Sequence, residues 1–265
     1  MSHFTVLVAV TADSPEEAET AVSEALRPFD ASLEVEELTD EDGETYWRNP
    51  QAHWDWWTIG GSWRGTFQAR IDAKTDDIMV PEPRSANEDA YLRPFAVDGG
   101  RAGMLRLQAQ RDRASNAALE DWDRYAKVID GTPQHEPWST FAGLVKDGGG
   151  TNQYTWDDAR RDYHNQPRIK GLRESQEYRR WLLDAPEDEI EGRSRDEYAA
   201  RKREQAIPGW ALLTLEGEWW EMGKIGWFAT SDRTDDSEAV YLTKANAYID
   251  ALDPDTWLVL VDCHI

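Results

Sequence analysis

The sequence predicts an α+β fold, a ferredoxin-like antiparallel sandwich with its first and last strands central and a large helical insertion. Short apolar segments near both ends, 4–10 and 257–261, have the composition of buried strands. The element pattern is β-α-β before residue 71 and β-β-α-β after residue 208, and the region between them is highly charged with helical periodicity. We therefore expect residues 1–71 and 208–265 to form the two halves of one sandwich, and residues 72–207 to form a loop and a helical insertion.

The N-terminal half contains the best-defined helix signal. A serine N-cap, a proline at the first helical position and a glutamate three residues after the serine predict a helix over 14–27, which Pro28 ends. Leucine and valine alternate with glutamate at 32–38, and this alternation predicts a half-exposed strand. A further strand is predicted at 62–71, directly after a tryptophan-rich stretch.

The same periodicities assign the rest of the chain. Residues 72–100 are rich in Asp, Pro and Gly and are predicted to be a loop, and 147–152, with three glycines, a linker or turn. Helices are predicted near 104–128, 156–164, 173–183, 187–205 and 236–252, and strands near 210–215, 219–222, 225–229 and 257–261.

The composition is strongly acidic, with a formal net charge of −23. Broad contact with nucleic-acid phosphates needs a basic surface, and anionic lipid repels acidic proteins, so we expect neither nucleic acid nor a membrane as a partner. No apolar run reaches transmembrane length, which predicts a cytoplasmic protein. The acidity fits simple solubility, a salt-adapted or GC-rich source, or mimicry of DNA by an inhibitor.

Tryptophan is the most informative residue type, because nine of the 14 tryptophans fall in two short windows. In the first window, rings are interleaved with polar side chains, a Gly-Gly pair permits close approach of a ligand, and an arginine offers a fork of donors. Strand alternation would place Trp54 and Trp56 on one face. These parts suit a nucleobase and its phosphate. The candidate ligand-binding residues are His53, Trp54, Asp55, Trp56, Trp57, Gly60, Gly61, Trp63 and Arg64. The competing interpretation is that the tryptophans are core and the glycines form a β-bulge.

The second window repeats this combination. Trp219 and Trp220 precede Gly223 and Lys224, and Trp227 follows. The Gly-Lys pair lacks the rest of a phosphate-binding P-loop and is not one. Lys224 and Trp227 join the candidate ligand-binding residues, with a hairpin tip as the alternative interpretation.

The C-terminal segment carries the catalytic candidates Cys263 and His264. Neighbours in a strand point to opposite faces, so these two side chains cannot pair directly, and a buried Cys263 more often serves as a small hydrophobe. His264 shares a face with Asp262, and with His53 and Asp55 they would form a metal or acid–base cluster. No known ligand spacing supports a metal, and we expect neither a metal nor a cofactor. A single cysteine also excludes an intramolecular disulfide.

Three segments of the chain resemble a family of bacteriophage and prophage proteins that has no assigned activity. They are Asn49-Pro50…His53-Trp54-Asp55-Trp56-Trp57…Gly60-Gly61-Ser62-Trp63, Gly223-Lys224-Ile225-Gly226-Trp227-Phe228 and the terminal Val261-Asp262-Cys263-His264-Ile265. The resemblance covers the two ends and not the middle. It departs at His53 and Ser62, where the family has Lys and Arg, and both changes remove positive charge. It implies a viral setting, and it implies that the three segments form one spatial unit.

The leading functional hypothesis is a viral ligand-sequestering protein, a sponge for a nucleotide-type signal of host defence. A base would stack on a tryptophan while a phosphate binds two basic side chains; the residues involved are Trp54, Trp56, Trp57, Trp63, Trp227, Arg64 and Lys224. One alternative is an enzyme acting on a nucleotide through Asp55, His53, His264 or Cys263. Another is an acidic inhibitor of a host DNA-binding enzyme. The binder is favoured over the enzyme because no recognisable catalytic motif is present. The sequence leaves the ligand and the oligomeric state open.

Overall fold

The computed structural model describes residues 3–39, 42–43, 45–47, 49–89, 91–147, 154–175, 190–224 and 232–265. The chain divides into two compact units. Unit 1 comprises Met1–Arg111 and Glu204–Ile265, and unit 2 comprises Asp112–Arg203. Every candidate residue that the structure describes belongs to unit 1.

The two most apolar strands lie side by side in the sheet of unit 1, as their composition predicts. β1 (His3–Val10) pairs antiparallel with β11 (Trp257–His264) along its whole length, with His3 opposite His264. On the far side of β1, β9 (Ala211–Leu213) runs parallel to it, and β10 (Trp219–Glu221) forms an antiparallel hairpin with β9. Strands buried on both faces need apolar side chains at nearly every position, which explains the continuous apolar runs.

Two strands share the other edge of β11. β4 (Trp56–Ile59) pairs with its C-terminal part, and β8 (Gly99–Arg101) pairs with its N-terminal part. β6 (Ile78–Met79) pairs with β8, which gives a seven-stranded mixed sheet in the described part of the chain. The path through this sheet is β10-β9-β1-β11-β8-β6, with β4 also on β11. The α+β fold class is confirmed, whereas a ferredoxin-like topology is not established.

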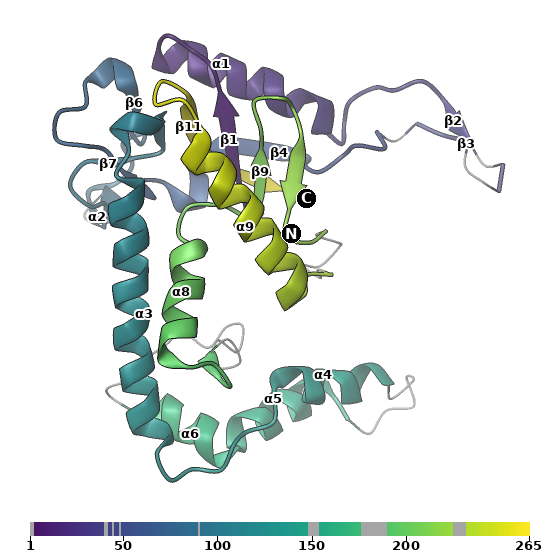
Figure 1. Cartoon of the computed structure of the whole chain (residues 1–265). Helices are drawn as coiled ribbons and strands as arrows, with labels where there is room; N and C mark the ends of the chain where they lie inside the picture. Colours follow the sequence, from purple (N-terminus) through teal and green to yellow (C-terminus); the bar gives the residue numbers. More distant parts are fainter. Residues whose placement is uncertain are drawn as a thin grey trace. The chain divides into compact units, whose positions relative to one another are not determined.

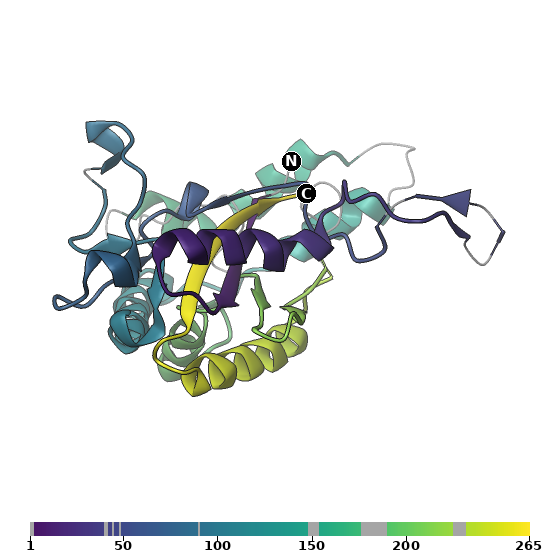
Figure 2. The ribbon, with the colours of Figure 1, turned by 90° about the horizontal axis from the view of Figure 1, so that it is seen from above.

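Helix α1 (Pro15–Leu26) covers one face of the sheet and α9 (Asp235–Ala251) covers the other (Figures 1 and 2). The α1 helix begins where its sequence signal predicts, because the Ser14 hydroxyl accepts a hydrogen bond from the Glu17 N–H. A short 3₁₀ turn, Arg27–Phe29, follows it. The two faces therefore hold separate cores, which α1 closes with Ala18, Val22 and Leu26 and α9 closes with Tyr241, Leu242, Ala245 and Ile249.

Residues 72–100 differ from their prediction, because they contribute β6 and β8 to the sheet instead of a plain loop. They also contain the one-turn helix α2 (Ala86–Asp89). The glycines that suggested a loop are needed for close strand packing. A Cβ on Gly99 would lie 2.7 Å from the carbonyl oxygen of Leu258 in β11. Glycine in a strand here marks close backbone approach, not a break.

Two predicted strands are also largely wrong. Of the strand predicted at 32–38, the structure has only the start of β2 (Leu38–Thr39), which pairs with β3 (Thr45–Tyr46). The strand predicted at 62–71 is replaced by a 3₁₀ turn, Gly61–Trp63, and by β5 (Phe67–Gln68), which pairs with β7 (Ala96–Val97). Such two-residue pairings depend on distant partners, which alternation of residue types does not report.

Unit 2, taken by itself, is helical, as predicted for the middle of the chain. Its helices are most of α3 (Leu107–Ile129), α4 (Trp138–Asp147), α5 (Trp156–Asn165), α6 (Pro167–Glu174) and most of α8 (Arg195–Glu204). Helix α4 and nearly all of α6 were not predicted from the sequence, and parts of the helices predicted at 173–183 and 187–205 lie outside the described residues. No helix among the described residues is long and apolar enough to span a membrane.

Candidate ligand-binding site

The site is built where β4 and β8 separate on the shared edge of β11. The separation is centred on Leu260, whose carbonyl accepts from the Gly60 N–H and whose N–H donates to the Asp98 carbonyl, both at 2.9 Å. β4 ends at Ile59, so the chain turns out of the sheet at Gly60 and Gly61. The Gly-Gly pair therefore marks the point at which the sheet edge opens.

Two buried aspartates surround this Gly-Gly turn. Asp98, 5% exposed, lies against Gly60, and Asp262, 1% exposed, lies against Gly61. Both glycines have positive φ, and a Cβ on either would overlap the neighbouring carboxyl group. The Ser62 N–H donates to Asp262 at 2.8 Å, and the Gly65 N–H donates to Asp98 at 2.5 Å. Backbone N–H groups that follow the turn thus donate hydrogen bonds to two carboxylates that are shielded from solvent.

A cavity of about 550 Å³ opens beside the turn, between the start of α1 and strands β4 and β6. Trp57 and Ile59 of β4 and Met79 of β6 are apolar members of its wall, and all three also contact the core under α1. Such a volume is in the range of small-molecule sites, which combine apolar walls with a few convergent polar groups. The charged residues that line it are Glu16, Glu19, Arg64, Glu82, Arg84 and Asp98.

The arginines of the cavity are already engaged with protein groups. Arg64 Nη2 donates to the Glu82 carbonyl at 2.6 Å and to the Asp89 carboxylate at 2.8 Å. Arg84 Nη2 donates to the carbonyl of Gly61 at 3.2 Å. The arginines therefore brace the walls, and Arg64 is not a free phosphate clamp of the kind that its fork of donors suggested.

Burial raises the pKa of the Asp98 carboxyl above its ordinary value of 3.8, while the Gly65 N–H and the charges of Arg64 and Arg84 oppose that shift. A perturbed carboxyl in a cavity is typical of functional sites. Asp98 was not predicted from the sequence. It stands between an apolar pair and a Gly-Gly pair, so its only signal is an acidic residue within an otherwise apolar and glycine-rich run.

The raised pKa of Asp98 predicts how stability depends on pH. Because the folded state holds this proton more tightly than the unfolded state, its stabilising contribution is present below 3.8 and is lost as pH rises through the higher folded pKa. We expect the free energy of unfolding of the wild type, relative to Asp98→Asn, to fall as the pH rises above 3.8 and through the higher folded pKa of Asp98. Urea denaturation of both proteins across this range measures the difference, and a flat or rising difference would contradict the assignment.

Four of the five tryptophans in the first window are candidate ligand-binding residues, and these four do not line one pocket. Trp54 is 7% exposed, lies in the core under α1 and donates its indole N–H to the Leu26 carbonyl. Trp57 packs edge-on against Trp54 and lines the cavity. Trp56 is 47% exposed, and Trp63 packs in the core under α9. The predicted alternation is wrong, because regular pairing of β4 with β11 begins only at Trp56 and Trp54 precedes it.

His53 lies away from this cavity. Its ring stacks on Trp219 of β10, with centroids 4.4 Å apart and planes 12° from parallel, and Nδ1 is 3.5 Å from the Glu221 carboxylate. Burial lowers the pKa of His53, with a further contribution from Lys224, and burial raises the pKa of Glu221. The structure therefore places His53 near Lys224 but not beside Arg64. Trp227 lies outside the described residues.

The C-terminal candidates are arranged around β11. His264 Nδ1 is 2.5 Å from an Asp55 carboxylate oxygen, and Asp262 pairs instead with His3, at 2.8 Å. Cys263 points to the opposite face and is fully buried in the core under α1, where burial raises the pKa of its thiol. His3 was not predicted as a site residue, because its partner Asp262 lies 259 residues away in the chain.

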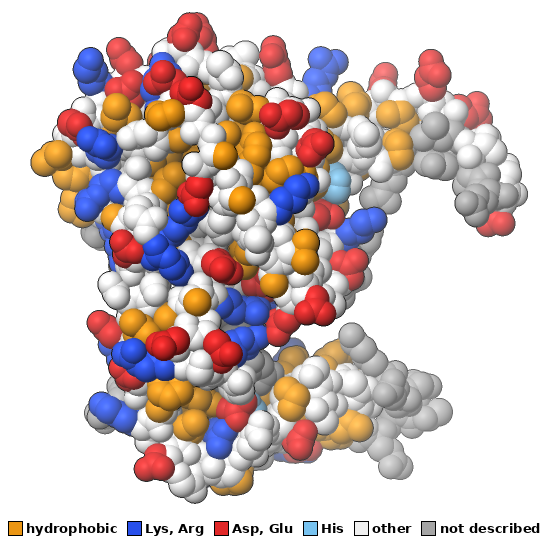
Figure 3. All heavy atoms as spheres, in the orientation of Figure 1, with side chains coloured by type: hydrophobic (Ala, Val, Ile, Leu, Met, Phe, Trp, Pro, Cys, Tyr) orange, Lys and Arg blue, Asp and Glu red, His pale blue; other side chains and the backbone are white. Residues whose placement is uncertain are grey.

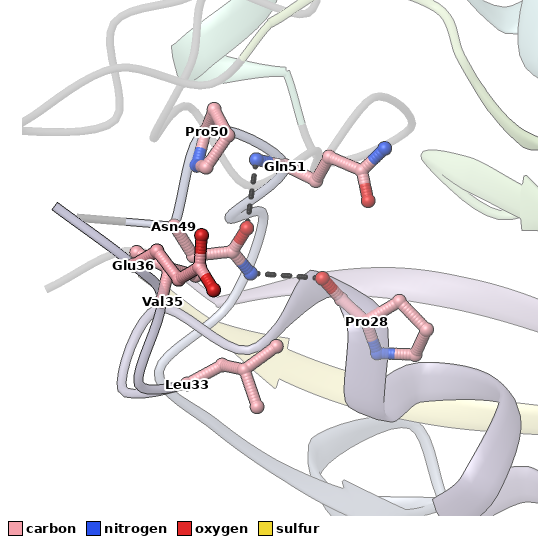
Figure 4. Close-up of a pocket in the computed structure, with 7 residues that line it drawn as sticks. All are labelled: Pro28, Leu33, Val35, Glu36, Asn49, Pro50 and Gln51. Carbon is pink, nitrogen blue, oxygen red and sulfur yellow. Dashed lines mark hydrogen bonds between the residues drawn. The ribbon is translucent and has the colours of Figure 1, made fainter. Parts of the chain in front are cut away.

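A smaller cavity, of about 330 Å³, lies beside Pro28, just after the end of α1 (Figure 4). Its walls are mostly apolar, and Asn49 crosses it to donate to the Pro28 carbonyl at 2.8 Å and to accept from the Gln51 N–H at 3.0 Å. The Asn49 amide thus holds the loop that leads into the tryptophan window. The lining side chains are Pro28, Leu33, Val35, Glu36, Asn49, Pro50 and Gln51, with one ionisable group among them.

Charge is interspersed on the face of the molecule that Figure 3 shows, where acidic and basic side chains alternate without forming a continuous acidic band.

Within the described residues, no three His, Cys, Asp or Glu side chains are grouped as a metal centre. Comparison of the chain with protein-family models, curated proteins and solved structures finds no match.

Proposed function

We propose that this protein binds and sequesters a small ligand that carries a planar heteroaromatic ring, such as the base of a nucleotide-type signal. The ligand would occupy the cavity beside the Gly60–Gly61 turn. The observation that supports this most directly is that one cavity joins an aromatic wall, Trp57, to a buried carboxyl, Asp98. Sites of this composition bind rings by stacking and orient them by hydrogen bonds.

Asp98 gives the cavity a preference for ligands that donate hydrogen bonds. Its Oδ1 accepts from Gly65, and the carboxyl lies on the cavity wall. A buried carboxyl gains most when a partner supplies a further donor, because an unmet acceptor in a low-dielectric site is costly. An amino or ring N–H group of a nucleobase supplies such a donor.

The charges around the cavity limit how many phosphates the ligand carries. Four acidic side chains and two arginines line it, and Arg64 is already paired with Asp89. A ligand with several phosphates would be repelled, whereas a nucleoside or a ligand with one phosphate would be tolerated. This changes the expected role of Arg64 from phosphate ligand to support of the wall.

A binder fits these observations better than an enzyme that uses Cys263 as its nucleophile. The thiolate is the reactive form of cysteine, and burial raises the pKa of the Cys263 thiol. A sequestering protein returns its ligand chemically unchanged. Mass spectrometry of the ligand recovered after denaturing the complex tests this, and a converted product would favour the enzyme.

The binding test compares Trp57→Ala with Trp56→Ala. Trp57 faces the cavity, while its neighbour Trp56 is exposed and is not part of the cavity wall, so the second variant is a matched control. Loss of one stacked ring costs about 1–3 kcal/mol, so we expect the dissociation constant to rise roughly 5- to 150-fold in Trp57→Ala and to be unchanged in Trp56→Ala.

Isothermal calorimetry with nucleosides, mononucleotides, cyclic nucleotides and ADP-ribose-type compounds measures these constants. Circular dichroism verifies that both variants are folded. If Trp57→Ala does not fold, Trp57→Phe, which retains a smaller aromatic ring, takes its place in the comparison. Absence of heat with the whole panel, or equal affinity of the two tryptophan variants, would contradict the proposal.

A further inference from the structure

Two histidines lie together at the ends of β1 and β11, each fixed by its own carboxylate. His3 Nδ1 is 2.8 Å from an Asp262 oxygen, and His264 Nδ1 is 2.5 Å from an Asp55 oxygen. His3 and His264 are direct cross-strand neighbours, and the Asp55 N–H also donates to the His264 carbonyl at 2.9 Å. Four side chains from three chain segments thus form one cluster on the face of the sheet opposite Cys263.

These contacts determine which ring nitrogen is available. A carboxylate only accepts hydrogen bonds, so in the neutral ring the proton is on Nδ1, which donates it. The lone pair of each imidazole is then on Nε2. A histidine with Nδ1–H held by a carboxylate and Nε2 unprotonated has the arrangement that metal-ligating histidines use, because the carboxylate fixes the ring and raises its basicity.

The Nε2 atom of His264 has no hydrogen-bond partner in the described part of the chain, although it is shielded from solvent. An unmet buried polar atom requires an explanation. The rings of His3 and His264 have centroids 5.2 Å apart at 66°. Two imidazoles bound through Nε2 to one tetrahedral metal ion, with metal–nitrogen bonds of about 2.0–2.1 Å, have centroids about 5 Å apart.

We propose that His3 and His264 form a two-histidine site for a divalent transition metal, of which Zn²⁺ is the probe of choice. Imidazole nitrogen is a preferred ligand of such ions, and the carboxylates of Asp55 and Asp262 add favourable negative charge beside it. Water completes the coordination, because the cluster supplies two ligand nitrogens and the described residues hold no group of three ligands. The site is independent of the ligand cavity, since none of its four residues lines that cavity.

Equilibrium dialysis of the full chain against ZnCl₂ tests the proposal. We expect one saturable equivalent of Zn²⁺ per wild-type chain and no saturable binding in His264→Gln or His3→Gln, which keep side chains of similar size. Asp55→Asn keeps both ligands but loosens the His264 ring, so we expect its affinity to fall about 10- to 100-fold. His53→Gln, a histidine of the same unit outside the cluster, should bind as the wild type does.

Histidine NMR separates this site from adventitious binding. Zn²⁺ should shift the Nε2 resonances of His3 and His264 and leave that of His53 in place. Thermal unfolding of each metal-free variant verifies that it is folded. Failure of the wild type to bind one equivalent, or equal binding by the His3→Gln/His264→Gln double variant, would overturn the proposal.

Discussion

Gly60→Ala is expected to destabilise unit 1 by about 2–6 kcal/mol, through backbone strain and overlap with a buried carboxyl. Gly60 has φ +68° and ψ −60°, a conformation that L-residues with a Cβ rarely adopt. An alanine Cβ would lie 2.5 Å from the Asp98 carboxyl, which cannot move far because it is buried and accepts from Gly65. Urea denaturation followed by circular dichroism measures the loss.

Gly217→Ala is the matched control for this prediction. Gly217 lies in the β9–β10 hairpin of the same unit and also has positive φ, +79°, but a Cβ there meets open space. It carries the backbone strain without the overlap, so we expect a cost of about 1–2 kcal/mol. Equal losses in the two variants would show that the carboxyl at Asp98 does not restrict Gly60.

Glu191→Ala is expected to destabilise unit 2 by about 3 kcal/mol or more, because it leaves a largely buried arginine without its ion partner. Glu191 accepts from Arg168 and from the Tyr125 hydroxyl, and Arg168 also donates to the Thr132 carbonyl at 2.9 Å. Burial raises the pKa of Glu191 and lowers the pKa of Arg168, so each charge depends on the other for its stability. The network joins α3 and the segment that follows it, helix α6, and the segment before α8.

An exposed ion pair of the same unit provides the comparison. Arg195 and Asp123 form two hydrogen bonds at 2.7 and 2.9 Å, but both side chains are solvent-exposed. Asp123→Ala should therefore change the thermal midpoint very little. Differential scanning calorimetry of the two variants makes the test; a Glu191→Ala midpoint as high as that of Asp123→Ala would refute a structural role for the buried network.

Several elements follow from local sequence because their signals are local. The apolar composition of 4–10 and 257–261 predicts central strands, and β1 and β11 confirm it. Capping residues predict the start of α1, and helical periodicity predicts α9 within a residue of its observed bounds. In each case the information lies within a few turns of the helix or within one strand, where residue pattern and structure correspond directly.

The cavity could not be predicted in the same way, because its parts come from segments with no local relation. Trp57, Gly61 and Arg64 were predicted as ligand-binding residues and do line it, but Asp98 and Arg84 come from a region predicted to be a loop. The position of Asp98 depends on β8, which follows it directly, is three residues long and is held by pairing with β11. No residue pattern of that length specifies a strand.

The tryptophan window shows the same division. Its composition identified the segment at which the sheet edge opens, but it did not determine which ring faces the ligand. Trp54 is core, Trp56 is exposed and Trp57 lines the cavity, because the chain enters β4 only after Trp54 has bonded to the end of α1. Side-chain direction depends on where strand pairing begins, and a neighbouring strand sets that point.

By itself, the sequence determined that this is an α+β protein, that its ends pair with each other, and that the segment 53–64 is chemically unusual. The tertiary structure alone decided that Asp98 and Asp262 enclose the Gly-Gly turn. It also decided that the His53 ring stacks on Trp219 and that the His3 ring contacts His264. The physical reason is the distance along the chain between the interacting residues, because helix caps and apolar runs depend on residues only a few positions apart. A buried carboxyl or a shared histidine pair is instead defined by partners that only the closed sheet brings together.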